Sequence, residues 1–414
     1  MQFKDVIGQR EIKSQLIKMN LENRISHALL FLGKEGSGAL SLARAFAQFI
    51  VCEKVNGKPG NNKSTTGIDL FGDVQATTIT GIEESKKDIH DSCGECAACI
   101  KASKLIHPDI HFSFPVISKK SDDHPKSSDY INEWREFILE HPYGNSYDWL
   151  QFIGAENKQG NITVYECTDI IRKISLKSFE SEYKILIMWM PELLGNIGNK
   201  LLKLLEEPPP DTLFILVAEN ESLILPTILS RTQLIKTPAL SILEVEAALE
   251  LRNGISLQKA EQIAAVTEGN YHEALQLLEH AGDDWEVMAR DWLNTIVKTG
   301  PAAQIKWIEE ISKTGREKQK QFLRYFNHSL QHAIRLRVMG ECASMKKNQD
   351  ETGADDFALR LNKICDISQQ YAIVQELDKA SYYIERNANA KILFHALTIK
   401  LYHIISNKSV ILMN

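Results

Sequence analysis

The chain has 414 residues, of which 43% are hydrophobic and 25% charged, values typical of a soluble globular protein of roughly two to four domains. Its formal net charge of −6 excludes a protein that attracts nucleic acid through a global positive field. No apolar run approaches the roughly 18 residues of a transmembrane helix, and the N-terminus lacks a signal pattern, so we expect a cytoplasmic protein without a membrane partner.

The first half of the chain alternates helical patterns with short apolar runs. This alternation predicts an α/β fold with a parallel sheet wrapped by helices. The second of two predicted helices stops at Pro208-Pro209-Pro210, because proline lacks the N–H group and clashes with the preceding turn. The predicted strands cover residues 28–32, 184–189, 213–218 and 233–236, and the predicted helices cover 39–51 and 199–207.

Two segments interrupt the alternation of strands and helices. Residues 53–92 are rich in Gly, Lys, Asn, Ser and Thr, which predicts an exposed insertion. Residues 115–160 are polar but contain Trp134, Tyr143 and Trp149, too many aromatic residues for disorder alone. We expect these aromatic side chains to pack a small subdomain within the second insertion.

The organisation changes after Pro238, where strand patterns end and helical patterns continue. We therefore expect an α/β domain over residues 1–238, which includes both insertions. A small helical lid is expected over residues 239–281, and a larger all-α domain over residues 282–414.

A glycine-rich turn follows the first predicted strand and precedes a helix. A working phosphate-binding loop reads G-x-x-x-x-G-K-[ST], in which the Lys contacts phosphate and the hydroxyl holds Mg²⁺. Gly33 and Gly38 occupy the two glycine positions, with Gly36 between them, but Ala39 and Leu40 replace the Lys and the hydroxyl residue. By itself the turn is equally compatible with a vestigial phosphate loop and with an ordinary strand-to-helix turn.

Four further motifs resolve this choice, because in this order they resemble bacterial clamp-loader AAA+ proteins. The resemblance spans residues 3 to about 280 and implies an α/β AAA+ P-loop domain with a cysteine-rich zinc module, a helical lid and a C-terminal helical collar. The motifs are Phe3-Lys4-Asp5-Val6-Ile7-Gly8-Gln9, Arg24-Ile25-Ser26-His27-Ala28-Leu29-Leu30-Phe31, Leu201-Leu202-Lys203-Leu204-Leu205-Glu206-Glu207-Pro208-Pro209 and Leu229-Ser230-Arg231-Thr232.

The residues that hydrolyse ATP in active members of this family are replaced in this chain. Counting back from the shared L-E-E-P-P helix, Met188 and Trp189 occupy the positions of the two catalytic acids. His272 stands where the lid's sensing arginine is expected. Because phosphoryl transfer depends on such positioned charges, we expect no ATP hydrolysis at this chain's own site.

Arg231 is a residue of catalytic type that remains intact in this chain. The resemblance implies that it reaches the ATP of a neighbouring subunit as an arginine finger, which raises hydrolysis by orders of magnitude. The alternative is a surface arginine that neutralises the C-terminal end of the short helix before it.

Three cysteines follow one another as Cys93-x-x-Cys96-x-x-Cys99. In a cytosolic chain this spacing indicates a metal site before it indicates disulfides, and a closed structural zinc site needs a fourth ligand. The resemblance implies Cys52 as that ligand. His90 and His107 are the alternatives.

Taken together, the motifs predict a non-catalytic subunit of a DNA polymerase III clamp loader, acting in DNA replication. The resemblance implies the delta and gamma/tau subunits as partners, with the sliding clamp and primed DNA reached through the complex. One alternative is an active ATPase motor of the gamma/tau type, against which Ala39, Leu40, Met188 and Trp189 argue. The other is a zinc-containing nucleic-acid-binding module, which would need a basic surface that an acidic chain does not obviously supply.

Overall fold

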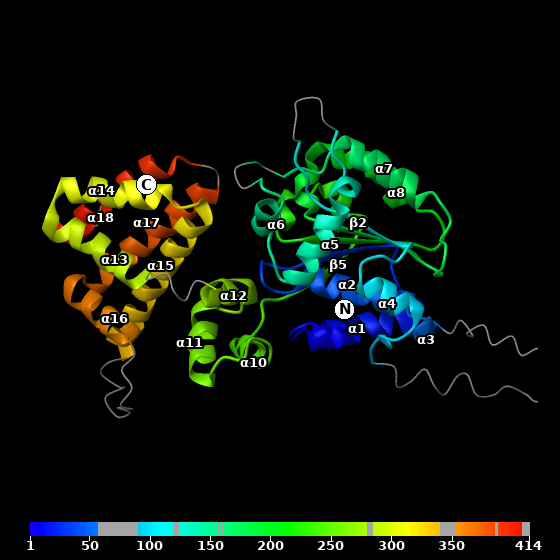
Figure 1. Ribbon diagram of the computed structural model, residues 1–414, viewed down its shortest axis with the longest axis horizontal. Coiled ribbons are helices and arrows are strands. Elements are labelled where there is room, and N and C mark those ends of the chain that lie inside the picture. Colours follow the sequence, from blue (N-terminus) through cyan, green and yellow to red (C-terminus); the bar gives the residue numbers. More distant parts are fainter. Residues whose placement is uncertain are drawn as a thin grey trace, which may run out of the picture. The chain divides into compact units, whose positions relative to one another are not determined.

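The computed structural model describes residues 1–56, 90–118, 124–155, 158, 160–279, 285–339, 353–385 and 388–407. Contacts divide the chain into two compact units, Met1–Leu278 and Glu279–Asn414, and each is described by itself (Figure 1). The predicted boundary between residues 281 and 282 falls among residues 280–284, outside the described residues. Most of the predicted insertion 53–92, namely residues 57–89, also lies outside them.

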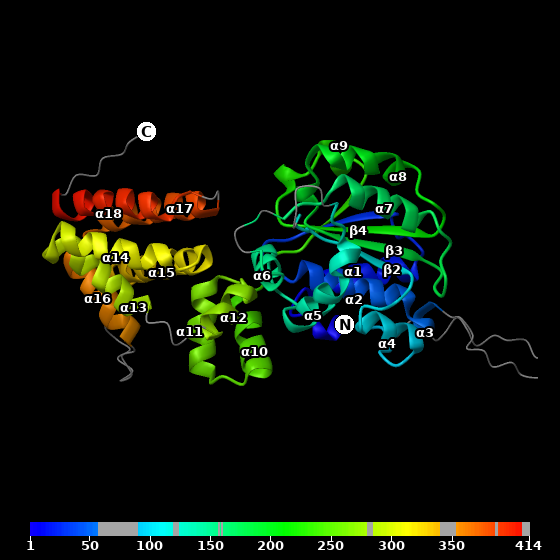
Figure 2. The same cartoon turned by 45° about the horizontal axis from the view of Figure 1, so that its top comes forward.

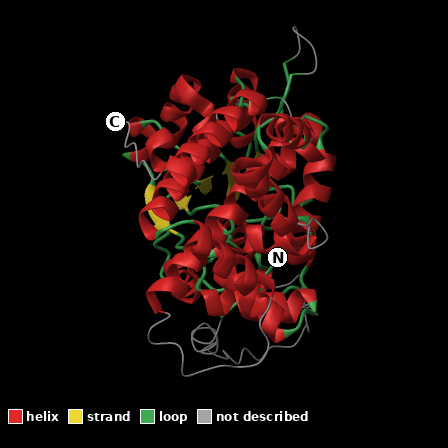
Figure 3. Ribbon diagram, turned by 90° about the vertical axis from the view of Figure 1, so that its left-hand side faces the viewer, coloured by secondary structure: helices red, strands yellow, loops and turns green. Residues whose placement is uncertain are grey.

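The first unit contains the five described strands, and the second has helices but no strand among its described residues. Figure 3 shows the helices and strands in separate colours. The strands are β1 Ala28–Leu32, β2 Ile110–Ser113, β3 Lys184–Trp189, β4 Thr212–Ala218 and β5 Gln233–Lys236. The α-helices of the first unit are α1 Arg10–Leu21, α2 Ala39–Val51, α3 Glu53–Asn56, α4 Ala97–Ser103, α5 Ile131–Glu140, α6 Ser146–Phe152, α7 Val164–Ile174, α8 Leu202–Glu206, α9 Pro226–Leu229, α10 Ile242–Asn253, α11 Leu257–Thr267 and α12 Tyr271–Glu279. Those of the second are α13 Trp285–Asn294, α14 Pro301–Lys313, α15 Arg316–Met339, α16 Gly353–Ile364, α17 Ile367–Glu385 and α18 Ala390–Asn407.

The five strands form one parallel sheet in the order β2-β3-β4-β1-β5. This arrangement confirms the α/β fold, and it confirms the predicted strands at 28–32, 184–189 and 233–236 to the residue. β1 lies between β4 and β5, so the loop that follows β1 emerges beside the carboxyl end of β4. That edge of a parallel sheet is where ligands bind in open α/β folds.

Helices cover both faces of the sheet, with α7, α8 and α9 on one face and α1, α2 and α5 on the other (Figure 2). Because side chains alternate along a strand, each strand contributes to two apolar cores. Phe31 and Trp189 belong to the core on the α2 face, whereas Leu30 and Met188 belong to the core on the α7 face. Strands buried on both faces explain the continuous apolar runs in the sequence.

Two details of secondary structure differ from the sequence prediction. β2 was not predicted, because Ile110-His111-Phe112-Ser113 is short and half polar. The predicted helix over residues 199–207 divides into a 3₁₀ segment, Pro191–Leu201, and the short helix α8, which ends before the three prolines.

The aromatic residues of the predicted insertion 115–160 do not form a separate subdomain. Trp134 and Trp149 are fully buried in the core on the α2 face of the sheet. The Trp134 ring stacks on Phe114 with centroids 4.1 Å apart and lies 5.2 Å from the Trp189 ring at the end of β3. This segment therefore completes the main core, and α5 and α6 belong to the layer that covers the sheet.

The second unit is built around its own apolar core, in which Trp292 and Trp307 stack with centroids 4.8 Å apart. Phe322, Phe326 and Phe394 surround this pair. The buried indole N–H of Trp292 donates to Thr398 Oγ1 at 3.0 Å, so its polar atom is satisfied. Across the described parts of both units, every helix is too short or too polar to cross a bilayer.

Candidate functional site

The loop between β1 and α2 has the backbone of a phosphate-binding turn. The N–H of Gly33 donates to Ala218 O at 3.0 Å, which fixes the loop beside the end of β4. Gly38 precedes the first residue of α2 with φ of +84°, a left-handed conformation that favours glycine. α2 then begins with Ala39 and Leu40, both buried, so the positions of the lysine and the hydroxyl residue carry apolar side chains. Ser41, one residue later, is buried and donates to Pro142 O at 2.6 Å.

Side chains leave a small space beside this loop. Trp189, Tyr143 and Leu40 line it, and the remaining volume is about 30 Å³, room for one or two water molecules. Glu35 and Glu219 also line the space. Lys34 is the cation among the described lining residues, but it is exposed and stands at the start of the loop, away from position 39, where a working loop has its lysine. Apolar rings and two carboxylates at the remaining positions make a poor cradle for the phosphates of a nucleotide, because like charges repel and desolvated anions need cationic partners.

Tyr143 is the side chain that closes the space, and the sequence analysis did not identify this role. Its buried hydroxyl accepts the N–H of Ile7 at 2.8 Å, and burial raises the pKa of the phenol. Its ring lies so close to Gly38 that a Cβ there would meet Tyr143 Cε1 at 2.8 Å. Tyr271 of the lid packs edge-on against it with centroids 5.0 Å apart. No sequence motif marks this residue, since its partners lie far from it along the chain.

The lid, formed by helices α10 to α12, contacts the glycine-rich loop directly. Gly36 has φ of +75°, and a Cβ there would overlap the side-chain oxygen of Asn270 and approach Tyr271 N to 2.8 Å. His272 Nε2 lies 3.5 Å from Glu35 Oε1 and 3.3 Å from Asp148 Oδ2. The structure thus places His272 beside the loop, facing two carboxylates.

The environment of those carboxylates explains why the lid and the loop stay together. Asn145 Nδ2 donates to Glu35 Oε1 at 3.1 Å, which ties the loop to the start of α6. Burial raises the pKa of Asp148, and His272 acts in the opposite direction. These side chains join the loop, α6 and the lid.

Met188 and Trp189, predicted to replace the catalytic acids, point to opposite faces of the sheet. Met188 is buried in the core on the α7 face, and Trp189 packs against Trp134 and Phe137. The next acid, Glu192, accepts the N–H groups of Glu219 at 2.6 Å and Asn220 at 2.9 Å. Burial raises the pKa of Glu192, and its two hydrogen bonds join the ends of β3 and β4.

Arg231 lies on the surface just after α9. Its Nε donates to Glu206 Oε1 at 2.7 Å, and its Nη2 forms an ion pair with the same oxygen. Its Nη1 donates to Thr227 O at 2.8 Å and to Ser230 Oγ at 3.0 Å. The contact with Thr227 is the one expected of an arginine at a helix C-terminus. The contact with Glu206, the last residue of α8, joins the two family motifs that contain these residues.

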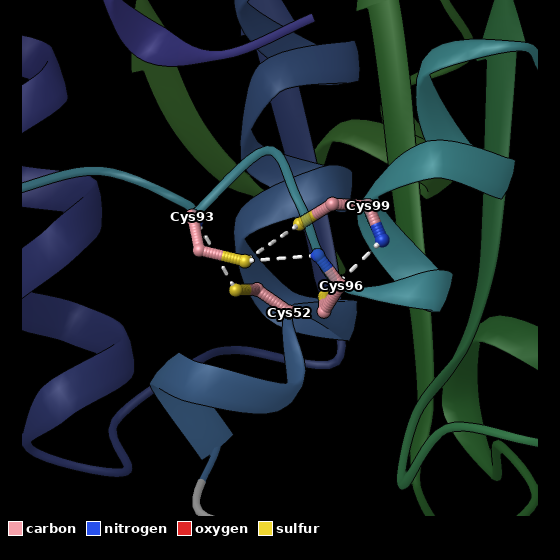
Figure 4. A group of neighbouring side chains, drawn as sticks. All are labelled: Cys52, Cys93, Cys96 and Cys99. Carbon is pink, nitrogen blue, oxygen red and sulfur yellow. Dashed lines mark hydrogen bonds between the residues drawn. The ribbon is translucent and has the colours of Figure 1, made fainter.

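The structure brings Cys52, Cys93, Cys96 and Cys99 together, with all four sulfur atoms within 4.8 Å of one another (Figure 4). Cys93 Sγ lies 3.9 Å from Cys99 Sγ, close to the roughly 3.8 Å between ligands of a tetrahedral zinc with Zn–S bonds of about 2.3 Å. The four thiols therefore fit a structural zinc site. Of the two alternative ligands, His90 is exposed, and neither it nor His107 belongs to this cluster.

Backbone N–H groups point at the sulfur atoms of the cluster. Cys93 N donates to Cys52 Sγ at 3.3 Å, Cys96 N to Cys93 Sγ at 3.3 Å and Cys99 N to Cys96 Sγ at 3.4 Å. Hydrogen bonds that the Cys52 sulfur accepts, first from Cys99 and then from the backbone, lower the pKa of Cys52 to about 5. The same contact raises the pKa of Cys99. Such donors favour the thiolate form that metal ligation requires.

The cysteine cluster also holds the N-terminal segment in place. Asp91 accepts the N–H groups of Phe3 at 3.0 Å and Lys4 at 2.9 Å, and Gln2 Nε2 donates to Ser92 O. This segment continues to Ile7, whose N–H group binds Tyr143. The cluster is therefore connected to the glycine-rich loop through the first seven residues of the chain.

The contact between Gly36 and the lid gives a direct test of this site. We expect Gly36→Ala to separate α12 from the loop, because the added Cβ overlaps Asn270, and to speed hydrogen exchange at residues 270–274. Gly254→Ala is the matched control, since Gly254 has a similar φ of +65° but open space around its Cβ. Both variants should lose about 1–2 kcal/mol from the left-handed conformation. Equal exchange rates at residues 270–274 in the two variants would contradict the contact.

Comparison with known proteins places the chain in a family. A family model described as "DNA polymerase III, delta subunit" matches residues 8–87 and 72–241. DNA polymerase III subunit tau of Bacillus subtilis is 26% identical over 327 residues, covering 76% of this chain and 44% of that protein.

Two delta′ subunits of DNA polymerase III match as well. The Bacillus subtilis protein is 24% identical, covering 62% of this chain and 55% of that protein. The Haemophilus influenzae protein is 25% identical, covering 61% and 54%. The chain thus matches about half the length of these relatives, which include both subunit types. The chain belongs to the DNA polymerase III delta-subunit family, and with it to the clamp-loader proteins of DNA replication.

Proposed function

We propose that this chain is a delta-prime-like, non-catalytic subunit of a bacterial DNA polymerase III clamp loader. In this role it scaffolds the complex with the delta and gamma/tau subunits and supplies Arg231 to the ATP of a neighbour. The proposal rests above all on the filled space beside the glycine-rich loop, where Trp189, Tyr143 and Leu40 leave about 30 Å³. A subunit without its own ATP site contributes to the cycle only through its contacts with others.

The surface position of Arg231 supports the second part of the proposal. A finger must be exposed to reach a neighbour, and it must be oriented so that little side-chain entropy is lost on contact. The guanidinium is about one-third exposed and is held by Glu206 and the α9 carbonyl. Its planar fork suits bidentate contact with phosphate oxygens.

The main alternative is an active motor of the gamma/tau type, which the similarity to a tau subunit keeps in consideration. An active site would need a cation at position 39 or nearby and an acid at position 188 or 189. Ala39 is buried in the first turn of α2, and Met188 and Trp189 are buried in two cores. A magnesium ion has no carboxylate to bind at these positions.

The first prediction concerns nucleotide. We expect purified chain to show neither magnesium-dependent ATP hydrolysis nor a rise in melting temperature with ATP, because a ligand that binds the folded state stabilises it. Tyr143→Ala should remain inactive as well, since removing a ring opens space but adds no catalytic charge. Turnover above background in a preparation free of partner subunits would favour the motor instead.

The second prediction concerns the metal. We propose that Cys52, Cys93, Cys96 and Cys99 hold one structural zinc, which would fix the N-terminal segment through Asp91 and Ser92. Elemental analysis should find one zinc per chain in protein purified without chelator, and Cys52→Ser should lower this content. Cys167→Ser, at a buried cysteine outside the cluster, should leave it unchanged. Full zinc content in Cys52→Ser together with loss in His107→Ala would assign the fourth position to His107.

The third prediction concerns Arg231 in the assembled complex. Arg231→Ala should reduce DNA-stimulated ATP hydrolysis and clamp loading, because a finger contributes about 10³–10⁵ in rate at the site it serves. The measured loss will be smaller where other ATP sites continue to turn over. Arg231→Lys should rescue poorly, since an ammonium cannot reproduce the guanidinium fork. Lys203→Ala, which removes an exposed cation from nearby α8, serves as the control.

In the same assay, Glu206→Gln tests whether Glu206 positions Arg231, without removing the arginine that would contact the neighbour's ATP. It preserves the shape of Glu206 but weakens the ion pair, so hydrolysis should fall between that of the wild type and that of Arg231→Ala. Melting temperature and assembly should stay nearly constant, because exposed ion pairs contribute at most about 1 kcal/mol. Unchanged hydrolysis in Arg231→Ala, with an intact complex, would reduce Arg231 to the end of a surface helix.

A further inference from the structure

A second cavity lies at the outer edge of the sheet, along β2, and shares no lining residue with the glycine-rich loop or the cysteine cluster among the described residues. Its volume is about 250 Å³. The wall combines apolar side chains, among them Ile106, Ile110 and Ile131, with the polar groups of His107, His111 and Arg135. A concave, mostly apolar wall with a few polar groups is the usual form of a small-ligand site.

His107 contributes a buried hydrogen-bond donor to this cavity. Its Nδ1 accepts the N–H of Asp109 at 3.1 Å, and burial lowers the pKa of the ring, so the neutral imidazole carries its proton on Nε2. The residue is 3% exposed, and Nε2 has no hydrogen-bond partner among the described residues. A buried donor without an acceptor costs about 1–3 kcal/mol, which a ligand acceptor would offset.

The ring of His107 is held firmly, because its partner Asp109 is itself fixed. The Asp109 carboxylate accepts the N–H groups of Phe179, Glu180 and Ser181 at 2.6–2.9 Å. These bonds lower the pKa of Asp109, so it remains ionised. With its carboxylate occupied by the loop 179–181, Asp109 offers its backbone to Nδ1 of His107, and the buried Nε2 is left without an acceptor among the described residues.

The other titratable side chains of the wall are a second histidine and two cations. His111 Nε2 is buried and has no hydrogen-bond partner within the described ranges, and burial, with help from Lys173 and Lys184, lowers the pKa of His111 to about 4. Arg135 donates through Nε to Leu105 O at 3.0 Å, but no described carboxylate lies within ion-pair distance of it. Lys173 already pairs with Asp169 at 2.7 Å. No Asp or Glu appears among the described lining residues.

We propose that this cavity binds a carboxylate joined to a small apolar group. The carboxylate would accept from His107 Nε2 and from the Arg135 guanidinium, which matches carboxylate geometry in a bidentate way, while the apolar group would contact the isoleucines. The volume lies below the range of about 300–1,000 Å³ for drug-sized ligands, so it suits a group the size of one amino-acid residue. A phosphate dianion fits less well, because an apolar wall makes its second charge costly to desolvate.

Such a carboxylate has two possible sources, a free organic acid or the C-terminal residue of another polypeptide. Both can be tested on the full chain carrying ¹³Cε1-labelled histidine, with signals assigned from single His→Gln variants. The probes are 4-methylpentanoate and the peptide N-acetyl-glycyl-leucine. We expect at least one probe to shift the His107 and His111 signals in a saturable way, and neither probe to shift that of His90, which is exposed and outside the cavity.

Uncharged probes and a matched pair of variants test the role of the carboxylate. The primary amides of both probes should bind at least about tenfold more weakly, equivalent to about 1.4 kcal/mol. Arg135→Gln should weaken binding by a similar factor, whereas Arg24→Gln, which removes an exposed arginine elsewhere, should not. Tighter binding of the peptide than of the acid identifies a chain terminus as the ligand, and the reverse order identifies a free acid. Absence of saturable shifts with both probes, equal binding of the amides, or an unaffected Arg135→Gln variant would overturn the proposal.

Discussion

The first unit depends on how the space at the end of β1 is filled. A glycine-rich turn that begins a helix exposes backbone N–H groups, and in nucleotide-binding folds a phosphate satisfies them. In this chain the turn is kept, but the Tyr143 ring lies against Gly38, and Trp189 also lines the space. Aromatic side chains thus lie where a phosphate would meet such a turn. The lid adjoins the same loop, since Asn270 lies against Gly36 and His272 lies beside Glu35.

This filling connects parts of the chain that are distant in sequence. Tyr143 binds the N–H of Ile7, and the segment before Ile7 is bound by Asp91 beside the cysteine cluster. The segment beside the cysteine cluster therefore holds the N-terminal residues, and Ile7 in turn binds the hydroxyl group of Tyr143. Because Cys93 lies far from Tyr143 along the chain, these links are non-local, and their formation must overcome the entropy of closing long loops. A bound metal would lower that cost by crosslinking Cys52 to the later cysteines.

The sequence predicts those features that are encoded locally, and this explains where it succeeded. Continuous apolar runs such as Leu29-Leu30-Phe31 specify strands that are buried on both faces, and the three prolines specify where α8 ends. β2 and Tyr143 could not be found in this way. β2 forms because its backbone pairs with β3, not because of its own composition, and Tyr143 acts through residues from three other segments. Cys52 was identified by family resemblance, and spacing alone could not separate it from His90 or His107.

The proposed function gives a physical reason for the contrast between the apolar space beside the glycine-rich loop and the surface arginine Arg231. A site that binds its own nucleotide must exchange contacts during each cycle, whereas the contacts of Tyr143, Asn270 and His272 are intramolecular and require no ligand. The loop, α6 and lid can then keep one arrangement through the cycle. Arg231 takes no part in these contacts. It is held by Glu206, the last residue of α8, and the three prolines that follow limit the length of this helix. A fixed scaffold that carries a pre-oriented arginine can serve a neighbour's changing site, because the orientation does not have to be established anew at each turnover.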